Sequence, residues 1–274
     1  MNYFRPYNHN VTLPILEHGN FLIKLVENKS ELKSAQSLRY SVFYKERNAK
    51  PSLSKKIIKL DYDSIDHFAH HLIVIDKTRK KSSNQIVGTY RLLKGDFARQ
   101  LGGFYTSSEF DLTNIIKIYR DNQILELGRS CIHKDYRNRN IMSLIWKFLA
   151  RYINLYDIKI LFGCASFPGI DVFKFSEQLF FLRDNFSLPN DLSVKSLDKD
   201  IFSIDTFKIK KVDMISTFLK LPPLIKGYLR VGGKVSDSYF VDHQFNTIDL
   251  CIAVKTENID YKYKKKYLNQ QFKS

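Results

Sequence analysis

The sequence predicts an α+β (mixed α/β) fold in which a central, mostly antiparallel sheet contains one right-handed β-α-β unit. Three observations support this prediction. Short apolar segments with strand character alternate with polar turns. One stretch, 141–155, carries a clear amphipathic helical stripe, and a strand-like segment lies on each side of it. At 274 residues, 44% of them hydrophobic, the chain can bury the core of one large domain or of two small ones.

The first half of the chain predicts a strand, a helix and a hairpin. The segments are a strand at 21–27, a helix at 31–46 and two antiparallel strands at 69–77 and 84–95. Asn28 to Ser30 offer N-caps for the helix. Arg39 shares the apolar face of this helix with Phe43, so a charge interrupts a stripe that is otherwise buried. The loop after the helix carries a cluster of acids: Asp61, Asp63 and Asp66.

The second half predicts the β-α-β unit and then helices and strands. The segments are a strand at 124–133, the helix at 141–155, a strand at 159–167, helical pieces near 171–183 and 222–231, and strands at 238–243 and 247–255. Ile141, Leu144 and Phe148 belong to the apolar stripe of the helix. Pro168 and Gly169 end the strand that follows it.

The charge balance predicts an acidic partner. Lys and Arg number 44 against 28 Asp and Glu, a formal net charge of +16. Such a charge attracts nucleic acid, an anionic membrane surface or an acidic protein, although an excess of charge can also be only a solvated surface. The basic tail at 257–274 concentrates lysines as an arm over an anionic surface would: Lys262, Lys264, Lys265 and Lys266.

Other features of the chain predict a cytoplasmic location. The chain lacks a run of about 18 apolar residues, and its N-terminus lacks a charged start followed by an apolar block. We therefore expect neither a membrane span nor a secretory signal. Cys131, Cys164 and Cys251 each lie in an apolar, strand-like stretch, and reduced thiols in the core of a cytoplasmic protein are the expectation.

The segment "ELGRSCIHKDYR" (126–137) combines a thiol with an imidazole. A thiolate nucleophile needs a base within hydrogen-bond reach, and Cys131 and His133 on one face of a strand are a poor way to supply it. The C-x-x-C and H-E-x-x-H spacings typical of zinc sites are absent from the sequence. We therefore expect packing at Cys131, and no metal.

Glu126 and Arg129 are two charges in the middle of the same predicted strand. Charges there are costly unless they are paired or face a cleft. Their odd separation would place them on opposite faces of a regular strand. A β-bulge, with Gly128 as its natural site, would turn both side chains to one side, and bulges are common beside active sites. A structural salt bridge is the alternative.

The turn "DYRNRN" (135–140) precedes the 141–155 helix. The free N–H groups of a helix N-terminus bind phosphate, and Arg137 and Arg139 add positive charge there. The G-x-G-x-x-G and P-loop nucleotide motifs are absent from the sequence. The turn is therefore a weak candidate for a phosphate site.

Several longer blocks resemble a known family. They are "LRYSVFYKE", "GTYRLL", "GGFYTSSEFDL", "LELGRSCIHKDYR", "LFGCASFPG" and "PPLIKGYLRVGG". They resemble the bacterial ornithine-acyl-[acyl carrier protein] N-acyltransferases, which have the GNAT fold and are related to the acyl-homoserine-lactone synthases. The resemblance runs from about residue 20 to about 256. It implies a single GNAT-like domain over 1–274 with a bulged central strand. It also implies a family-specific insertion at about 171–215, which shapes an acyl tunnel or packs as ordinary core.

Individual residues of this chain match individual residues of the family's motifs. Glu126 and Arg129 match the Glu and Arg of the family's central strand, which implies catalytic roles. Matches of the family's other motifs imply substrate-binding roles for Arg39, Phe43, Asp63, Asp66 and Arg91. Two departures exist. His70 stands where the family has an acid, and the turn before the central helix lacks the GNAT glycines. The second departure favours a carrier-protein donor over coenzyme A, because a phosphopantetheine arm carries one phosphate.

The resemblance implies transfer of a 3-hydroxyacyl chain from acyl carrier protein to the α-amine of L-ornithine, which gives lyso-ornithine lipid. Glu126 would act as base, directly or through water, and backbone N–H groups at 128–130 would bind the oxyanion. Arg129 and Arg91 would clamp the acceptor's carboxylate or order the acids, while Asp63 and Asp66 would hold the cationic acceptor. Arg39, at the mouth of the site, would meet the phosphate or the loop acids.

The same hypothesis names a donor and partners. Ser130, Arg137 and Arg139 would bind the acyl-phosphopantetheine arm of acyl carrier protein, with no resident cofactor. The expected partners are acyl carrier protein, L-ornithine and, transiently, an anionic membrane surface at its inner face, with no nucleic acid. One alternative is N-acylation of another amino acid or acyl-homoserine lactone synthesis. Another is a basic membrane- or nucleic-acid-binding protein with an inactive GNAT fold.

Overall fold

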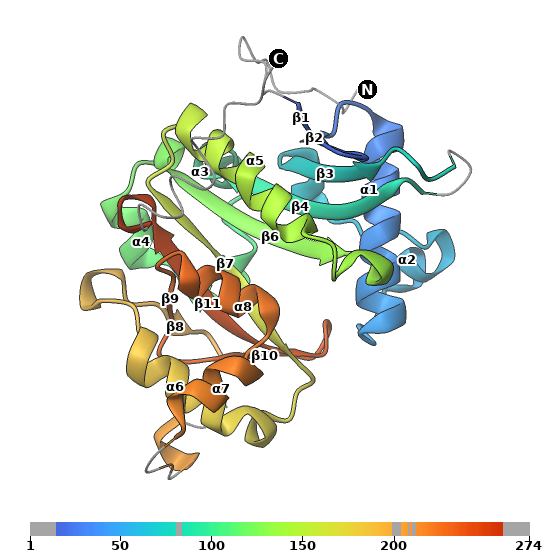
Figure 1. Cartoon of the computed structure of the whole chain (residues 1–274). Coiled ribbons are helices and arrows are strands. Elements are labelled where there is room, and N and C mark those ends of the chain that lie inside the picture. The colour runs from blue at the N-terminus through green and yellow to red at the C-terminus, as the bar shows by residue number, and fades with distance from the viewer. Residues whose placement is uncertain (1–14, 81–83, 199–203, 208, 210–211, 260–274) are drawn as a thin grey trace.

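One large, mostly antiparallel sheet forms the centre of the molecule (Figure 1). The computed structural model describes residues 15–80, 84–198, 204–207, 209 and 212–259. The main path of the sheet runs β1 (Leu16–His18), β2 (Phe21–Leu25), β3 (His70–Asp76), β4 (Ile86–Lys94), β6 (Ile124–Ile132), β7 (Ile160–Pro168), β11 (Thr247–Lys255) and β10 (Phe240–Asp242). A short β9 (Lys234–Val235) pairs with β11, and β5 (Phe110–Asp111) pairs with β8 (Lys195–Ser196) in a separate small sheet.

The β6–β7 pair is parallel, whereas the other pairs of described strands are antiparallel. Helix α5 (Ile141–Leu155) connects β6 to β7, so the predicted β-α-β unit is confirmed. The predicted α+β class with a mostly antiparallel sheet is confirmed as well. The remaining α-helices are α1 (Lys29–Tyr40), α2 (Leu53–Ile58), α3 (Gly95–Gln100), α4 (Thr113–Ile118), α6 (Ser176–Phe186), α7 (Met214–Lys220) and α8 (Pro223–Arg230).

Helices cover both faces of the sheet. Leu125 and Leu127 of β6 pack in the same core as the apolar stripe of α5, which crosses in front of β6 in Figure 1. Cys131 of β6 packs instead with Ala35 and Leu38 of α1. Among the described residues, no helix is long and apolar enough to cross a membrane.

The predicted helix at 31–46 is confirmed, with a change of geometry near its end. Asn28 caps α1, and its side chain accepts the N–H of Glu31 at 2.9 Å. The chain then continues from Ser41 to Glu46 as a π-helix, the wider turn that often marks functional sites.

Strand β6 contains the predicted bulge. Thr89 of β4 faces Cys131, and Arg91 faces Gly128, so Tyr90 alone faces both Arg129 and Ser130. The extra residue is Arg129, whose φ of 52° lies in the left-handed region. For a residue other than glycine this conformation costs roughly 1–2 kcal/mol. The prediction of a bulge is therefore confirmed, with Arg129 rather than Gly128 in the left-handed position.

Strands β6 and β7 pair only over their first residues and then separate (Figure 1). Their register runs from Ile124–Ile160 to Glu126–Phe162. The next residue of β7 is Gly163, where a Cβ would lie 2.2 Å from the carbonyl oxygen of Leu127. Only glycine therefore permits the close approach at the point where the two strands part.

Two other predicted segments lie partly outside the described residues. In the 171–215 segment, Leu179 and Leu182 join the main core, while Phe175 lines the cavity described below. Residues 199–203, 208 and 210–211 of that segment are not described. The lysines of the basic tail also lie outside the described residues, since the description ends at Ile259.

Candidate active site

A cavity of about 740 Å³ lies where β6 and β7 separate. Its wall includes residues 126–132 of β6 and, on β7, Cys164, Ser166 and Pro168. The start of β11, the π-helix and the junction between α7 and α8 also contribute to the wall. The cavity therefore opens between two strands whose backbones have parted, next to the bulge.

Glu126 is buried in the wall of this cavity and is held by three donors. Its Oε1 accepts the backbone N–H of Thr106 at 2.6 Å and the Thr106 hydroxyl at 2.6 Å. Its Oε2 accepts the backbone N–H of Tyr105 at 3.1 Å. A carboxylate offers about four acceptor positions, so Glu126 can still receive a proton or a water molecule.

Arg129 points to the same side of β6 as Glu126. Its guanidinium lies 4.6 Å from the ring centres of both Tyr105 and Phe245, and Tyr105 also binds Glu126. Arg129 donates to Asp63 at 3.0 Å, and its Nε lies 3.3 Å from Asp61. Glu126 and Arg129 thus bind different partners, and the bulge brings both onto one wall rather than joining them as a salt bridge.

Arg129 belongs to a buried ion-pair network, which also contains Arg39, Asp61, Asp63, Asp66 and Arg91. Arg39 holds Asp66 with two parallel bonds of 3.0 and 2.9 Å, and its Nε donates to Asp61 at 2.8 Å. Arg91 donates to Asp63 at 2.6 Å and to Asp66 at 2.9 Å. The two-residue and three-residue spacing of the loop acids allows each one to meet a different pair of arginines.

In the network, the negative charges of the aspartates are balanced by the positive charges of neighbouring arginines. Burial by itself raises the pKa of Asp66, but Arg39, His71 and Arg91 outweigh it and hold that pKa well below its usual value. The pKa of Asp61 is lowered in the same way against burial, by Arg39 and Arg129. Both carboxylates are therefore ionised across the physiological range.

Several of the residues predicted from the sequence belong to this network and do not lie where they were expected. The expectation that Arg39 lies at the mouth of the site is wrong, because its side chain is 0% exposed; its contact with the loop acids is confirmed. Among the described residues, the cavity wall excludes Arg39, Asp63, Asp66 and Arg91 and includes Phe43. Asp63 keeps 23% of its side chain exposed, whereas the Asp66 side chain is 1% exposed.

Of the three predicted phosphate-binding residues, two line the cavity and one lies outside it. Ser130 and Arg137 line the cavity, and Arg137 binds Glu46 and the carbonyl oxygen of Ile132. Arg139 lies outside the wall, with its guanidinium 4.9 Å from the ring centre of Tyr136. Sequence reasoning missed two further cations of the wall, which are Arg47 and Lys220. Arg47 lies four residues after Phe43, and this helical spacing could have placed both side chains on the same face of a helix.

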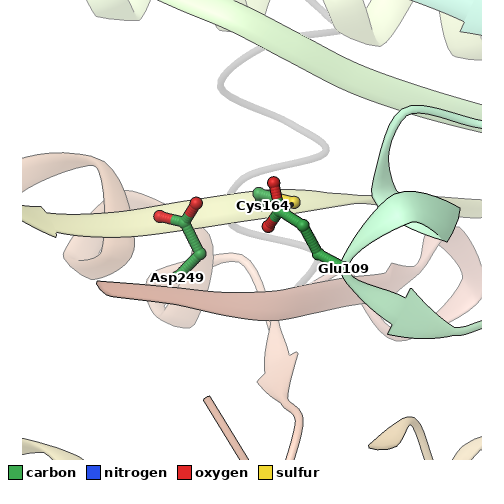
Figure 2. A group of neighbouring side chains, drawn as sticks. All are labelled: Glu109, Cys164 and Asp249. Carbon is green, nitrogen blue, oxygen red and sulfur yellow. Dashed lines mark hydrogen bonds between the residues drawn. The ribbon is translucent and has the colours of Figure 1, made fainter. Parts of the chain in front are cut away.

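A second group, two buried carboxyls and a partly buried thiol, was also missed. Glu109, Cys164 and Asp249 point toward one another from three segments, and one ligand atom of each lies within 4.8 Å of the others (Figure 2). The Cys164 thiol donates to Glu109 at 3.1 Å. Cys164 and Asp249 line the cavity. In number and type of ligand atoms this group is also the one described cluster that could hold a metal ion.

The electrostatics of this second group are the reverse of those of the network. Burial raises the pKa of Glu109 to about 9, with Asp249 adding to the shift. Burial likewise raises the pKa of Asp249 to about 6, and Asp242 adds to it. The pKa of the Cys164 thiol is raised well above its usual value by burial and by Glu109. Glu109 therefore keeps a proton that an ordinary carboxyl releases well below neutral pH.

Cys131 and His133, the thiol and imidazole noted in the sequence, do not form a comparable cluster. Cys131 is buried against α1, and burial raises its pKa to about 12, so the prediction of a packing role is confirmed. His70 and His71 point to opposite sides of β3. His70 meets the hydroxyl of Tyr152, and His71 meets the carbonyl oxygen of Asp66.

Comparisons with known proteins agree on one group. The family model of the acetyltransferase (GNAT) domain matches residues 38–147. The chain is 33% identical over 246 residues to an L-ornithine N(alpha)-acyltransferase of Agrobacterium fabrum, covering 89% of this chain and 84% of the relative. It is 34% identical over 249 residues to an L-ornithine N(alpha)-acyltransferase of Rhodobacter capsulatus, covering 90% and 95%.

A solved structure supports the fold. The N-acyl amino acid synthase from uncultured soil microbes superposes with a TM-score of 0.50 at 9% identity, covering 93% of this chain and 98% of that one. At this identity the similarity shows a common fold, and it extends over nearly all of both chains.

Proposed function

The chain belongs to the family of the L-ornithine N(alpha)-acyltransferases, with a GNAT fold, and we propose that it moves a 3-hydroxyacyl chain from acyl carrier protein to the α-amine of L-ornithine. The product would be lyso-ornithine lipid. The observation that carries the mechanism is the cavity at the β6–β7 separation, with Glu126 and Arg129 on one wall.

The donor arm enters between the separated strands. The β6–β7 register ends at Glu126–Phe162, so the backbone of β6 beyond this point faces the cavity rather than β7. Arg47, Arg137 and Lys220 add positive charge to the wall, as a phosphopantetheine phosphate requires. Acyl carrier proteins are acidic, and the net charge of +16 favours their approach.

Glu126 accepts the proton of the attacking amine. An ammonium is not a nucleophile, so a base must remove a proton before the nitrogen attacks the thioester carbonyl. Collapse of the tetrahedral intermediate then breaks the C–S bond and releases the phosphopantetheine sulfur, which leaves as the thiol after it takes up a proton. Glu126 has an acceptor position left beside its three donors, at the cavity wall. The backbone N–H donors from Tyr105 and Thr106 fix the orientation of the carboxylate without neutralising its charge.

Arg129 binds the α-carboxylate of the acceptor, and backbone N–H groups at 128–130 receive the oxyanion. The guanidinium is held by Tyr105, Phe245 and two acids, so it is placed before substrate arrives. Arg39, Asp66 and Arg91 act as positioning residues that hold Asp63, and through it Arg129.

The runner-up functions keep the same chemistry with a different acceptor, either another amino acid or the substrate of acyl-homoserine lactone synthesis. Membership of an acyltransferase family argues against the alternative of an inactive fold that binds nucleic acid or membrane. Delivery of the product to the anionic inner face of the membrane, without stable insertion, is part of the proposal.

The test is mass spectrometry of lipids from a host that makes no ornithine lipid, expressing either this chain or its Glu126→Gln variant at equal levels. We expect a lyso-ornithine lipid with the first and its loss with the second. A different acylated amino acid would replace the acceptor in the proposal. Undiminished product from a folded Glu126→Gln variant would remove Glu126 as base.

A further inference from the structure

Ornithine differs from most α-amino acids by a second ammonium at the end of a three-carbon side chain. The proposed function, on which this inference rests, requires a site for that charge. We propose that Asp249, with Thr247 beside it and Glu109 and Cys164 behind it, receives the side-chain ammonium of the acceptor. This assignment differs from the sequence-based expectation, which gave the cation to Asp63 and Asp66.

The acids of the ion-pair network are poorly suited to this task. Asp66 accepts two bonds from Arg39, one from Arg91 and one from the Gln36 amide. Asp63 accepts from Arg91 and Arg129 and also caps the 3-10 helix Ser64–His67. A substrate cation there would have to compete with guanidinium groups that are already bound.

Asp249 is in the opposite situation. It is 4% exposed, it lines the cavity, and its buried Oδ1 has no hydrogen-bond partner within the described residues. The buried hydroxyl of Thr247, two residues earlier on the same face of β11, likewise makes no hydrogen bond of normal geometry there, although it lies close enough to Asp249 to lower the pKa of that carboxyl. Buried oxygens that lack partners are costly, and a ligand that donates hydrogen bonds would remove that cost.

The charge state of the group suits one monovalent cation. With a pKa of about 9, Glu109 keeps its proton near pH 7, whereas Asp249, with a pKa of about 6, is mostly ionised. Cys164, which donates to Glu109, stays a thiol. The group thus presents one negative charge to the cavity. A metal ion would need the thiolate and both carboxylates, so the ammonium is favoured.

Tyr105 relates this site to the reaction centre. Its ring faces the Arg129 guanidinium at 4.6 Å, its N–H donates to Glu126, and its hydroxyl lies 3.5 Å from Asp242, another acid of the wall. An amino acid lying along Tyr105 would offer its α-carboxylate to Arg129 and its α-amine to Glu126. Its side chain would then extend toward the paired strands β10 and β11, where Asp242 and Asp249 lie.

The experiment compares two acceptors in each enzyme variant. L-Norvaline has the carbon chain of ornithine without the side-chain ammonium, and the ratio of kcat/KM for ornithine to that for norvaline isolates the contribution of this ammonium. Both acceptors are assayed in the same preparation, with 3-hydroxyacyl-loaded acyl carrier protein as donor, so loss of folded protein cancels. We expect Asp249→Asn to lower the ratio about 10- to 100-fold.

Asp63→Asn is the matched comparison, since it makes the same chemical change in the other group of acids. We expect its ratio to stay within about threefold of wild type, whatever happens to its turnover. If Asp249→Asn does not fold, Thr247→Val decides, with an expected fall of about 3- to 10-fold.

Three outcomes would overturn the assignment. The first is a ratio that is unchanged in Asp249→Asn and lost in Asp63→Asn, which would return the cation to the network. The second is an unchanged ratio in both variants. The third is a stoichiometric divalent metal in the purified protein that disappears in Asp249→Asn while the ratio stays unchanged. Failure of wild type to acylate ornithine at all would instead contradict the proposed function.

Discussion

Two groups of acids lie near the same cavity, the aspartates of the network and the group of Glu109, Cys164 and Asp249, and they differ in how their charge is balanced. In the N-terminal half, each aspartate of the network meets at least two cationic groups. In the second group, Glu109 and Asp249 face the Cys164 thiol and each other. Burial alone would raise the pKa of every one of these acids, yet the first group has lowered values and the second has raised values.

The difference teaches where substrate charge can be accommodated. A buried acid with arginine partners is already neutralised, and its main effect is to orient those arginines. A buried acid without a cationic partner either stays protonated or, when ionised, is able to bind a cation from the substrate. A binding site requires this property. Asp61, Asp66 and Asp249 are all buried aspartates, so it is their partners that separate them.

The largest effect should follow from breaking the paired group. Asp66→Asn leaves Arg39 and Arg91 buried with one carboxylate fewer, and we expect a loss of about 3–5 kcal/mol in the free energy of unfolding. Urea denaturation measures it. The exposed Asp157→Asn is the control, expected within about 0.5 kcal/mol of wild type. Equal stability of the two variants would mean that the network does not stabilise the fold.

A third kind of buried carboxylate sharpens the comparison, because Glu126 is held by neutral donors rather than by arginines. Glu126→Gln removes the base, and we expect kcat to fall about 100-fold or more while the free energy of unfolding changes much less than in Asp66→Asn. Steady-state kinetics and urea denaturation measure the two quantities. A large loss of stability with unchanged kcat per folded molecule would assign Glu126 to the structure alone.

The unpaired group should make stability depend on pH. The folded pKa of Glu109 is raised to about 9 from 4.5, so the folded state retains a proton that the unfolded state releases above about pH 4.5. The associated stability is complete below pH 4.5 and is lost as pH rises toward 9. Glu109→Gln is neutral throughout, so we expect its Tm to exceed that of wild type by about 2 °C or more at pH 8 and by less at pH 5.

Thermal scans at the two pH values test this prediction. Glu17→Gln, at an exposed position paired with Lys77, should leave the Tm difference between pH 5 and pH 8 as it is in wild type. A Tm gain in Glu109→Gln that is the same at both pH values would contradict the raised pKa.

The smallest effect concerns the cations of the cavity wall. Arg137 lines the cavity and Arg139 does not, although they lie in the same turn. We expect Arg137→Ala to raise KM for the acyl carrier protein donor about threefold at low salt, and less at high salt. Arg139→Ala, the matched control, should change KM by less than half as much. A larger effect in Arg139→Ala would place the phosphate on the outer side of the turn.

The sequence alone was informative wherever a local pattern carries the meaning. The odd separation of Glu126 and Arg129 predicted a bulge, because the side chains of a strand alternate strictly unless a residue is inserted. The apolar stripe at 141–155 predicted α5 and with it the parallel β6–β7 pair. Arg39 on an apolar helix face indicated an unusual charge, and the loop acids, one of its two expected partners, do bind it, although the side chain is buried rather than at the mouth of the site.

Tertiary structure alone decided which buried acids have cationic partners. Nothing local distinguishes Asp66, in an acidic loop, from Asp249, in an apolar strand, as a site for a substrate cation. The distinction arises because folding brings Arg39 and Arg91 into contact with Asp66. Asp249 instead lies beside Glu109 and Cys164, which are 140 and 85 residues away in the sequence. The pKa of a buried acid depends on the charges within a few ångströms of it, and those distances exist only after the chain has folded.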